Sequence, residues 1–217
     1  MTEGNGLIPV GMKMKTMTAL LLLALALPAR AETLKIDPST GSLRVVVEKD
    51  GPLRALGHDH VLRAPAFEGS VELSGASAKL VLTIDAQALT IDRPDERRDQ
   101  HWGSITEADI PKIEASMRGP AGLDVARFPT LRLVSESIEP VAGEKDTWLV
   151  TGRFSLHGST QTIDFPVVMT DGLGGRWFSG YVRLRPSDYG IKPFSLFLGG
   201  LRVKDEAVVR FSLFGRR

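Results

Sequence analysis

The sequence predicts an all-β domain with a short helical insert, and two features of the chain carry this prediction. After residue 32, apolar residues recur with a period of two, which is the period of a half-buried strand. These runs have strand length and are separated by turns rich in Gly, Pro and Asp. The stretch between Arg93 and Pro129 breaks the pattern. We therefore expect one system of strands, with helix on a single connection.

The expected strands fall on both sides of this insert. Alternation is clearest where Leu80, Leu82 and Ile84 face one way and polar residues face the other. The expected strands are Leu43–Glu48, Phe67–Leu73, Ala78–Asp85, Leu131–Ile138, Trp148–His157, Thr162–Thr170, Arg176–Arg185 and Val203–Phe214. Hairpin loops are expected at Gly158–Thr160 and Asp171–Gly175, because glycine and polar residues concentrate there.

The insert is expected to contain helix. Asp109–Met117 is typical of a short helix, because Pro111 lies in its first turn and Gly119 follows its end. Arg93–His101 is expected to add a helical turn in which acidic and basic residues are mixed. We interpret the charged cluster in and before this turn as a solvated turn held by ion pairs. Its members are Asp92, Arg93, Asp95, Glu96, Arg97, Arg98 and Asp99.

About eight long antiparallel strands can close into an up-and-down barrel or stack as a sandwich. Closure is favoured because it removes the exposed edges of such long strands. One face of each of the last four expected strands is apolar, and in a barrel that face points inward. Periodicity does not distinguish a filled interior from an empty one, since both need the same residue types.

The N-terminal segment has the pattern of a cleavable signal peptide. Two lysines close to Met12 precede the apolar run Ala19–Leu27, and small residues occupy the cleavage-determining positions before Glu32. The run is shorter than the roughly 20 apolar residues that a membrane-spanning helix needs. We expect cleavage after Ala31, export to the periplasm and no integral membrane anchor.

This expectation divides the chain into two parts. Residues 1–31 form an N-terminal extension and signal peptide, with Met12 or Met14 as alternative starts to Met1, and residues 32–217 form one barrel domain. The first part carries three cations and one carboxylate, so its removal changes the net charge from +1 to −1. Nothing electrostatic therefore favours nucleic acid as a partner.

Neither cysteine chemistry nor a catalytic motif is indicated. The chain has no cysteine, which excludes disulfides, thiol nucleophiles and thiolate metal sites. It has no Gly-x-Ser-x-Gly elbow, and its paired glycines do not open a helix after a strand as a phosphate loop requires. We therefore predict a binding protein rather than an enzyme.

Three histidines are candidate metal ligands. If residues 57–62 are extended, His58 and His60 point to the same face and can ligate one ion. A third ligand from His101 would complete a three-histidine site with an open position for water. Structural roles in turns and backbone hydrogen bonds are favoured over a metal, because a pair of histidines two residues apart is a weak indication.

Seven short motifs follow one another in an order and spacing that resembles the YceI-like family. They are Leu34–Pro38, Phe67–Gly69, Arg98–His101, Phe128–Leu131, Leu156–Thr160, Asp188–Ile191 and Val203–Ala207. The resemblance extends over residues 33–214. It implies a lipocalin-like, eight-stranded periplasmic barrel with a long apolar tunnel, which in some members holds a polyisoprenoid chain.

The resemblance also implies a ligand and a site. The ligand is an isoprenoid or a similar long apolar lipid, quinone-like compounds included, and the protein is its carrier. The side chains expected along the tunnel, chosen by strand phase, are Phe154, Phe165, Val167, Phe178, Val182 and Phe211. The residues expected to meet a head group at the mouth are Arg93, Arg97, Arg98 and His101.

Two alternative functions stay open. One is a metal-binding protein or metal-dependent enzyme that uses the three histidines. The motif Gly57–His60 is typical of one branch of the family, and Gly103–Ala126 is longer than in its short members, so the expected mouth leaves room for a metal. The other is a stress-response scaffold with a filled barrel. Whether two barrels form a homodimer is also left open.

Overall fold

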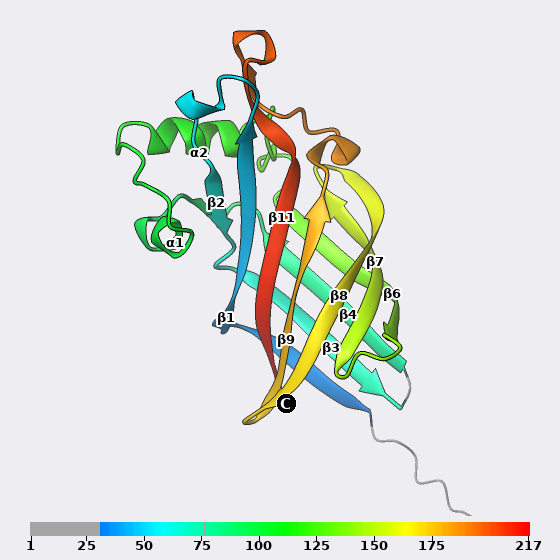
Figure 1. Cartoon of the computed structure of the whole chain (residues 1–217). Coiled ribbons are helices and arrows are strands. Elements are labelled where there is room, and N and C mark those ends of the chain that lie inside the picture. The colour runs from blue at the N-terminus through cyan, green and yellow to red at the C-terminus, as the bar shows by residue number, and fades with distance from the viewer. Residues whose placement is uncertain (1–30, 76) are drawn as a thin grey trace, which may run out of the picture.

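The computed structural model describes residues 31–75 and 77–217, which form a closed antiparallel β-barrel (Figure 1). The predicted signal peptide, apart from Ala31, lies outside the described residues. The barrel strands, in their order around the wall, are β1 (Glu32–Asp50), β3 (Phe67–Ser74), β4 (Ser77–Asp85), β6 (Thr130–Pro140), β7 (Thr147–Leu156), β8 (Ser159–Gly172), β9 (Gly175–Leu184) and β11 (Leu201–Arg216). Strand β11 pairs again with β1, and this pairing closes the barrel.

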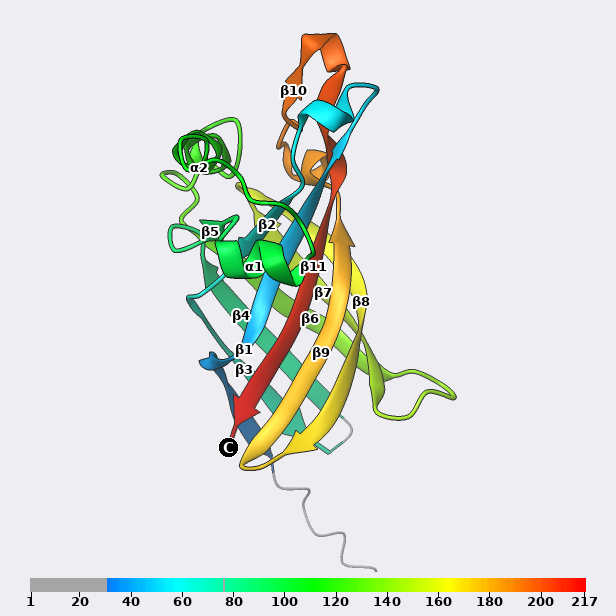
Figure 2. The ribbon, with the colours of Figure 1, turned by 60° about the vertical axis from the view of Figure 1, so that its left-hand side comes forward.

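The remaining elements are short and lie outside the closed wall. They are the strands β2 (His60–Arg63), β5 (Thr90–Ile91) and β10 (Ser195–Leu196), the helices α1 (Pro94–Asp99) and α2 (Ile110–Arg118), and the 3-10 turns η1 (Arg54–Leu56), η2 (Pro186–Tyr189) and η3 (Phe197–Gly199). Figures 1 and 2 show α2, η1, β10 and η3 gathered at one end of the barrel, which we call the helical end. The β3–β4, β6–β7 and β8–β9 hairpins lie at the opposite end. Among the residues that the structure describes, no helix has the length and apolar character required to span a membrane.

The predicted all-β architecture is confirmed, with the insert where it was expected. Each of the eight expected strands corresponds to one strand of the barrel, and α2 lies within one residue of the helix predicted at Asp109–Met117. The hairpins are tighter than predicted. Leu156 pairs with Ser159, so the turn between β7 and β8 contains only His157 and Gly158, both with positive φ. Such a two-residue turn matches the twist of the flanking strands, and the ladder therefore begins immediately after it.

Strand β1 is much longer than predicted because it bends and changes partner. Its register against β11 shifts between Asp37 and Gly41. Before the shift its neighbour on the other side is β3, and after it that neighbour is β2. Gly41 has a φ of 114°, and a Cβ there would lie 2.2 Å from the carbonyl oxygen of Ser212. The bend therefore requires glycine, and it lets one strand serve both the barrel wall and the layer that carries α1.

Candidate functional site: an apolar cavity with a polar mouth

The barrel encloses a cavity of about 900 Å³ that its own side chains do not fill. The wall runs from Leu73 and Ala78, near the β3–β4 hairpin, to Lys192 and Lys204 at the helical end. Most of the lining side chains are aliphatic or aromatic. Periodicity left open whether the interior is filled or empty, and the structure shows that it is hollow. The filled barrel of the scaffold alternative does not agree with this structure.

The inward phase predicted for the last four strands is confirmed, because these side chains lie along the cavity. All six tunnel residues chosen by strand phase are on its wall: Phe154, Phe165, Val167, Phe178, Val182 and Phe211. The rings of Phe165 and Phe211 meet edge to face, with centroids 5.8 Å apart. The period of two is the physical reason for this placement, since alternate residues of each strand share one face. Their contact with a ligand stays a prediction.

The ionisable side chains of the cavity wall lie at its helical end. They are His58, His60, Asp109, Lys112, Lys192 and Lys204. Lys112 donates to Asp109 at 2.9 Å, and this contact, after the hydrogen bond from Thr106, lowers the pKa of Asp109. The hydrogen bond to Glu206 raises the pKa of Lys204. The mouth thus combines an apolar interior with a group of ionisable side chains, of which Lys112 and Lys204 are paired with carboxylates.

Helix α2 lies over this mouth because its last residue is tied to the barrel. The guanidinium of Arg118 donates to the carbonyl oxygens of Gln87 and Leu89, in the loop between β4 and β5. Pro111 in the first turn and Gly119 after the last turn set its ends. Ile113 and Met117, one turn apart on the same face, line the cavity.

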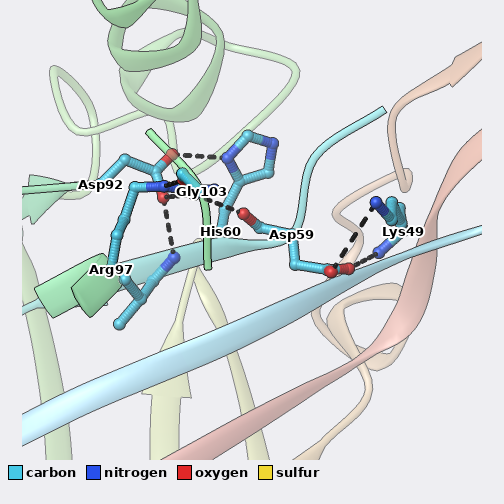
Figure 3. Close-up of polar contacts among 7 residues, drawn as sticks. Lys49, Asp59, His60, Asp92, Arg97 and Gly103 are labelled. Carbon is cyan, nitrogen blue, oxygen red and sulfur yellow. Dashed lines mark hydrogen bonds and ion pairs between the residues drawn. The ribbon is translucent and has the colours of Figure 1, made fainter. Parts of the chain in front are cut away.

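His60 is a polar side chain of the mouth that a buried carboxylate holds in place (Figure 3). It opens β2, and its Nδ1 lies 2.6 Å from Oδ2 of Asp92. A carboxylate only accepts, so Nδ1 carries a proton and donates it to this bond. The other ring nitrogen, Nε2, points away from Asp92 (Figure 3). The ring thus presents Nε2 as a polar contact that is fixed in direction.

Asp92 is itself held by a buried network. Its side chain accepts from Arg97 at 2.8 Å and from the backbone N–H of Val61 at 3.2 Å, besides the bond from His60. Arg97 also donates to the carbonyl oxygens of Asp59 and Gly103, both at 2.7 Å. Burial alone would raise the pKa of Asp92, but the hydrogen bonds from His60 and Arg97 outweigh it and lower that pKa. The carboxylate therefore stays ionised and keeps His60 oriented.

The four residues expected at the mouth lie elsewhere. Arg97 is buried in the network around Asp92. Arg93, Arg98 and His101 are exposed and lie before, on and after α1, respectively. None of the four lines the cavity, because α1 packs outside the barrel against β2. Their contact with a head group stays untested. The structure offers His58, His60, Lys112 and Lys192 at that position instead.

The interpretation of the charged cluster as a solvated turn is wrong for three of its seven members. Asp92, Glu96 and Arg97 are buried, and Glu96 receives the guanidinium groups of Arg44 and Arg63. These two arginines come from β1 and β2, on which α1 packs. The ion pairs that these arginines form with Glu96 are tertiary contacts, which the local charge pattern could not indicate.

The three candidate metal ligands do not come together. His58 and His60 share the cavity wall, as their spacing predicted, but His101 lies after α1 with an exposed side chain. Across the described residues, no three His, Asp or Glu side chains are grouped closely enough to hold a metal ion. In this structure Nδ1 of His60 is engaged by Asp92, which leaves Nε2 as its free ring nitrogen.

The sequence does not identify Lys112 and Lys192 as residues of the mouth. Lys112 lies on a helix and Lys192 in a loop, and a single lysine in either setting looks like an ordinary surface residue. The nearest indication was the i, i+3 pair of Asp109 with Lys112, which marks a helix surface but not what that surface covers. Only the fold shows that both lysines border the cavity.

Comparisons with known proteins agree with this architecture. The YceI-like domain family matches residues 34–214. Among solved structures, the chain is similar to Burkholderia cenocepacia BcnA, with a TM-score of 0.61 and 18% identity over 82% of this chain and 98% of that one. It is also similar to a polyisoprenoid-binding domain from Saccharophagus degradans, with a TM-score of 0.54 and 16% identity over 84% of this chain and 97% of that one. A search of curated proteins found no match.

At these identities the two structures share the fold, and the family match carries the assignment. It spans the barrel from β1 to β11, including the helical insert and every strand that lines the cavity. The seven motifs that suggested the resemblance all lie within it. The chain therefore belongs to the YceI-like family.

Proposed function

We propose that this protein is a carrier that holds an isoprenoid or a similar long apolar lipid inside its barrel. The observation that carries the proposal is the hollow interior of about 900 Å³ with its apolar wall. Volumes of this size are typical of sites for ligands as large as a drug or a lipid tail. Each Å² of apolar surface removed from water contributes about 25 cal/mol, so a long hydrocarbon chain gains ample affinity from burial alone.

The position of the charged groups supports one orientation of the ligand. The hydrocarbon chain would occupy the barrel, and a polar head group would lie at the helical end among His60, Lys112 and Lys192. Lysine ammonium groups and the Nε2 of His60 suit an anionic or carbonyl oxygen. This assignment replaces the arginines of α1 as candidate head-group contacts, because they lie outside the cavity.

Membership of the family and the leader sequence support the remaining parts of the proposal. The similar domain from Saccharophagus degradans is described as polyisoprenoid-binding, which favours binding over catalysis for this chain as well. The signal-peptide pattern that ends at Ala31 favours the periplasm as the location. A carrier of water-insoluble chains is useful in an aqueous space that lies beside membranes.

A cavity-filling substitution tests the proposal. Val182 of β9 faces the cavity, so a larger side chain there enters space that a ligand would use. Val168 of β8 is an exposed valine outside the cavity and gives a matched control. We expect wild type and Val168→Trp to co-purify with an apolar ligand in native mass spectra, and Val182→Trp to lose it while remaining folded by circular dichroism. Wild-type protein with no apolar ligand and no affinity for one would refute the carrier function.

A further inference from the structure

Two loops at the helical end form an exposed hydrophobic surface that the carrier function does not explain. We call it the apolar tip. It consists of Leu53, Leu56, Phe194, Leu196, Phe197 and Leu198, all of them exposed. The side chain of Phe197 is 65% exposed, and that of Leu198 is fully exposed. In Figures 1 and 2 these loops, which carry η1, β10 and η3, project beyond the end of the barrel.

Backbone hydrogen bonds hold the two loops of the apolar tip together. The backbone N–H of Leu53 donates to the carbonyl oxygen of Gly200 at 2.7 Å, which joins the β1–β2 loop to the β10–β11 loop. A second bond, from the N–H of Gly200 to the carbonyl oxygen of Phe197, closes the turn at 3.0 Å. Phe197 and Leu198 both have positive φ, at 51° and 56°. Bulky residues rarely adopt this conformation, so the fold keeps two large apolar side chains at the apex despite its strain.

The apolar tip is continuous with the cavity. Leu56, Phe194 and Leu196 are exposed to solvent and are also part of the cavity wall. These three apolar side chains therefore connect the barrel interior with Phe197 and Leu198 at the end of the apolar tip. A ligand that leaves through the helical end would pass along it.

Cations flank the apolar tip. Arg54 lies between the two leucines of the β1–β2 loop, and Lys192 precedes Phe194 by two residues. Both side chains are exposed, and neither forms an ion pair with any residue that the structure describes. The nearby carboxylates of Glu48 and Asp50 are instead paired with other cations, on β11. Apolar side chains with adjacent free cations are the composition of a surface that binds anionic membranes.

We infer that the apolar tip inserts into the surface of a lipid bilayer, with Arg54 and Lys192 against anionic head groups, so that the cavity mouth faces the membrane. Two narrow, projecting loops suit a bilayer better than a protein partner, which needs roughly 800 Å² of complementary surface on each side. This inference goes beyond the carrier function, because binding to a membrane does not require a ligand in the barrel. It gives the carrier a site at which it loads and unloads.

The test uses flotation of the purified protein with vesicles of phosphatidylcholine alone or mixed with phosphatidylglycerol. The variant Phe197→Ser/Leu198→Ser removes the apex, and Leu173→Ser is the matched control, since Leu173 is a fully exposed leucine in the β8–β9 turn at the opposite end. We expect the fraction of the apex variant that floats with the vesicles to be at least about ten-fold lower than for wild type. The reason is that each exposed apolar side chain adds to partitioning from water into the bilayer. Leu173→Ser should float like wild type, and Arg54→Glu/Lys192→Glu should lose the preference for phosphatidylglycerol.

Any of three results would overturn the inference. The first is wild-type protein that does not float, and the second is an apex variant that floats as well as Leu173→Ser. The third is a wild-type dimer in analytical ultracentrifugation that the apex variant converts to a monomer without any change in flotation, because a second copy would then cover the apolar tip. The cavity variant Val182→Trp separates this test from that of the carrier function, since it should float normally while holding no ligand.

Discussion

At the scale of single residues, the buried charges around α1 determine the shape of the mouth. Asp92 is 3% exposed and Glu96 is 1% exposed. Asp92 accepts hydrogen bonds from His60 and Arg97, and Glu96 forms ion pairs with Arg44 and Arg63. Such groups are tolerated in an interior only when they are fully paired. Asp92 orients His60, while Glu96 fastens α1 to the strands beside it. Removing the charge of Asp92 therefore leaves the buried Arg97 without its counter-ion.

The variant Asp92→Asn tests this role. Asn keeps the size of the side chain but not its charge, so we expect a loss of about 3 kcal/mol in the free energy of unfolding, the cost of breaking a buried pair. The control is Asp95→Asn, whose pair with Arg93 is exposed and screened by solvent, so we expect little change in stability. Urea unfolding monitored by tryptophan fluorescence measures both. Equal losses for the two variants would contradict the role given to Asp92.

At the scale of elements, β1 is the strand that the barrel wall and the layer of β2 and α1 share. Its period of two predicted a strand at Leu43–Glu48, and the structure extends that strand in both directions. The extension depends on the shifted register near Gly41, where β1 leaves β3 and joins β2. No local pattern marks such a change of partner, because it is decided by the strands on either side.

The variant Gly41→Ala should disturb this bend. A methyl group there meets the Ser212 carbonyl oxygen, and the backbone has positive φ, so we expect a loss of roughly 2–3 kcal/mol. Gly143 has positive φ as well, but a Cβ there meets nothing within 4 Å. Gly143→Ala should therefore cost only the conformational strain of about 1 kcal/mol. Thermal unfolding compares the two, and a Gly41→Ala protein as stable as Gly143→Ala would argue against a required bend.

At the scale of the whole molecule, closure depends on the seam between β1 and β11, where the first and last strands of the barrel meet. Ion pairs lie along it. Asp37 pairs with Arg216, and Asp50 pairs with Arg202. Hydrogen bonds from Ser39 and Arg216 lower the pKa of Asp37, and those from the Gly51 backbone and Arg202 lower the pKa of Asp50. Protonation of these two carboxylates would remove the ion pairs from the seam.

We expect stability to fall in acid for this reason. A carboxylate with a lowered pKa in the folded protein contributes fully above its unfolded value of 3.8 and loses that contribution as the pH falls through the folded value. The denaturant midpoint should therefore be lower at pH 3 than at pH 7. Hydrogen exchange should report earlier opening of β1 and β11 than of β7 and β8. The variant Asp37→Asn/Asp50→Asn should lose less on acidification than wild type, and an equal loss would exclude the seam as its source.

The sequence by itself determined the local features of this protein. The period of two predicted the strands and the faces that line the cavity, since alternate side chains of a strand share a face whatever the strand pairs with. Pro111 and Gly119 predicted α2, because caps act within one turn. The family resemblance predicted the lipocalin-like closure that periodicity left open between barrel and sandwich.

Only the tertiary structure decided how these pieces combine. The seam pairs the first strand of the barrel with the last, and side chains of β1 and β2 hold the buried Asp92 and Glu96. The lysines at the mouth also come from distant parts of the chain, from α2 and from the loop before β10. The hollow interior has the same cause, because the space inside a barrel depends on how all of its strands tilt and stagger together. The apolar tip becomes a projecting surface only where two loops that are distant in the chain meet.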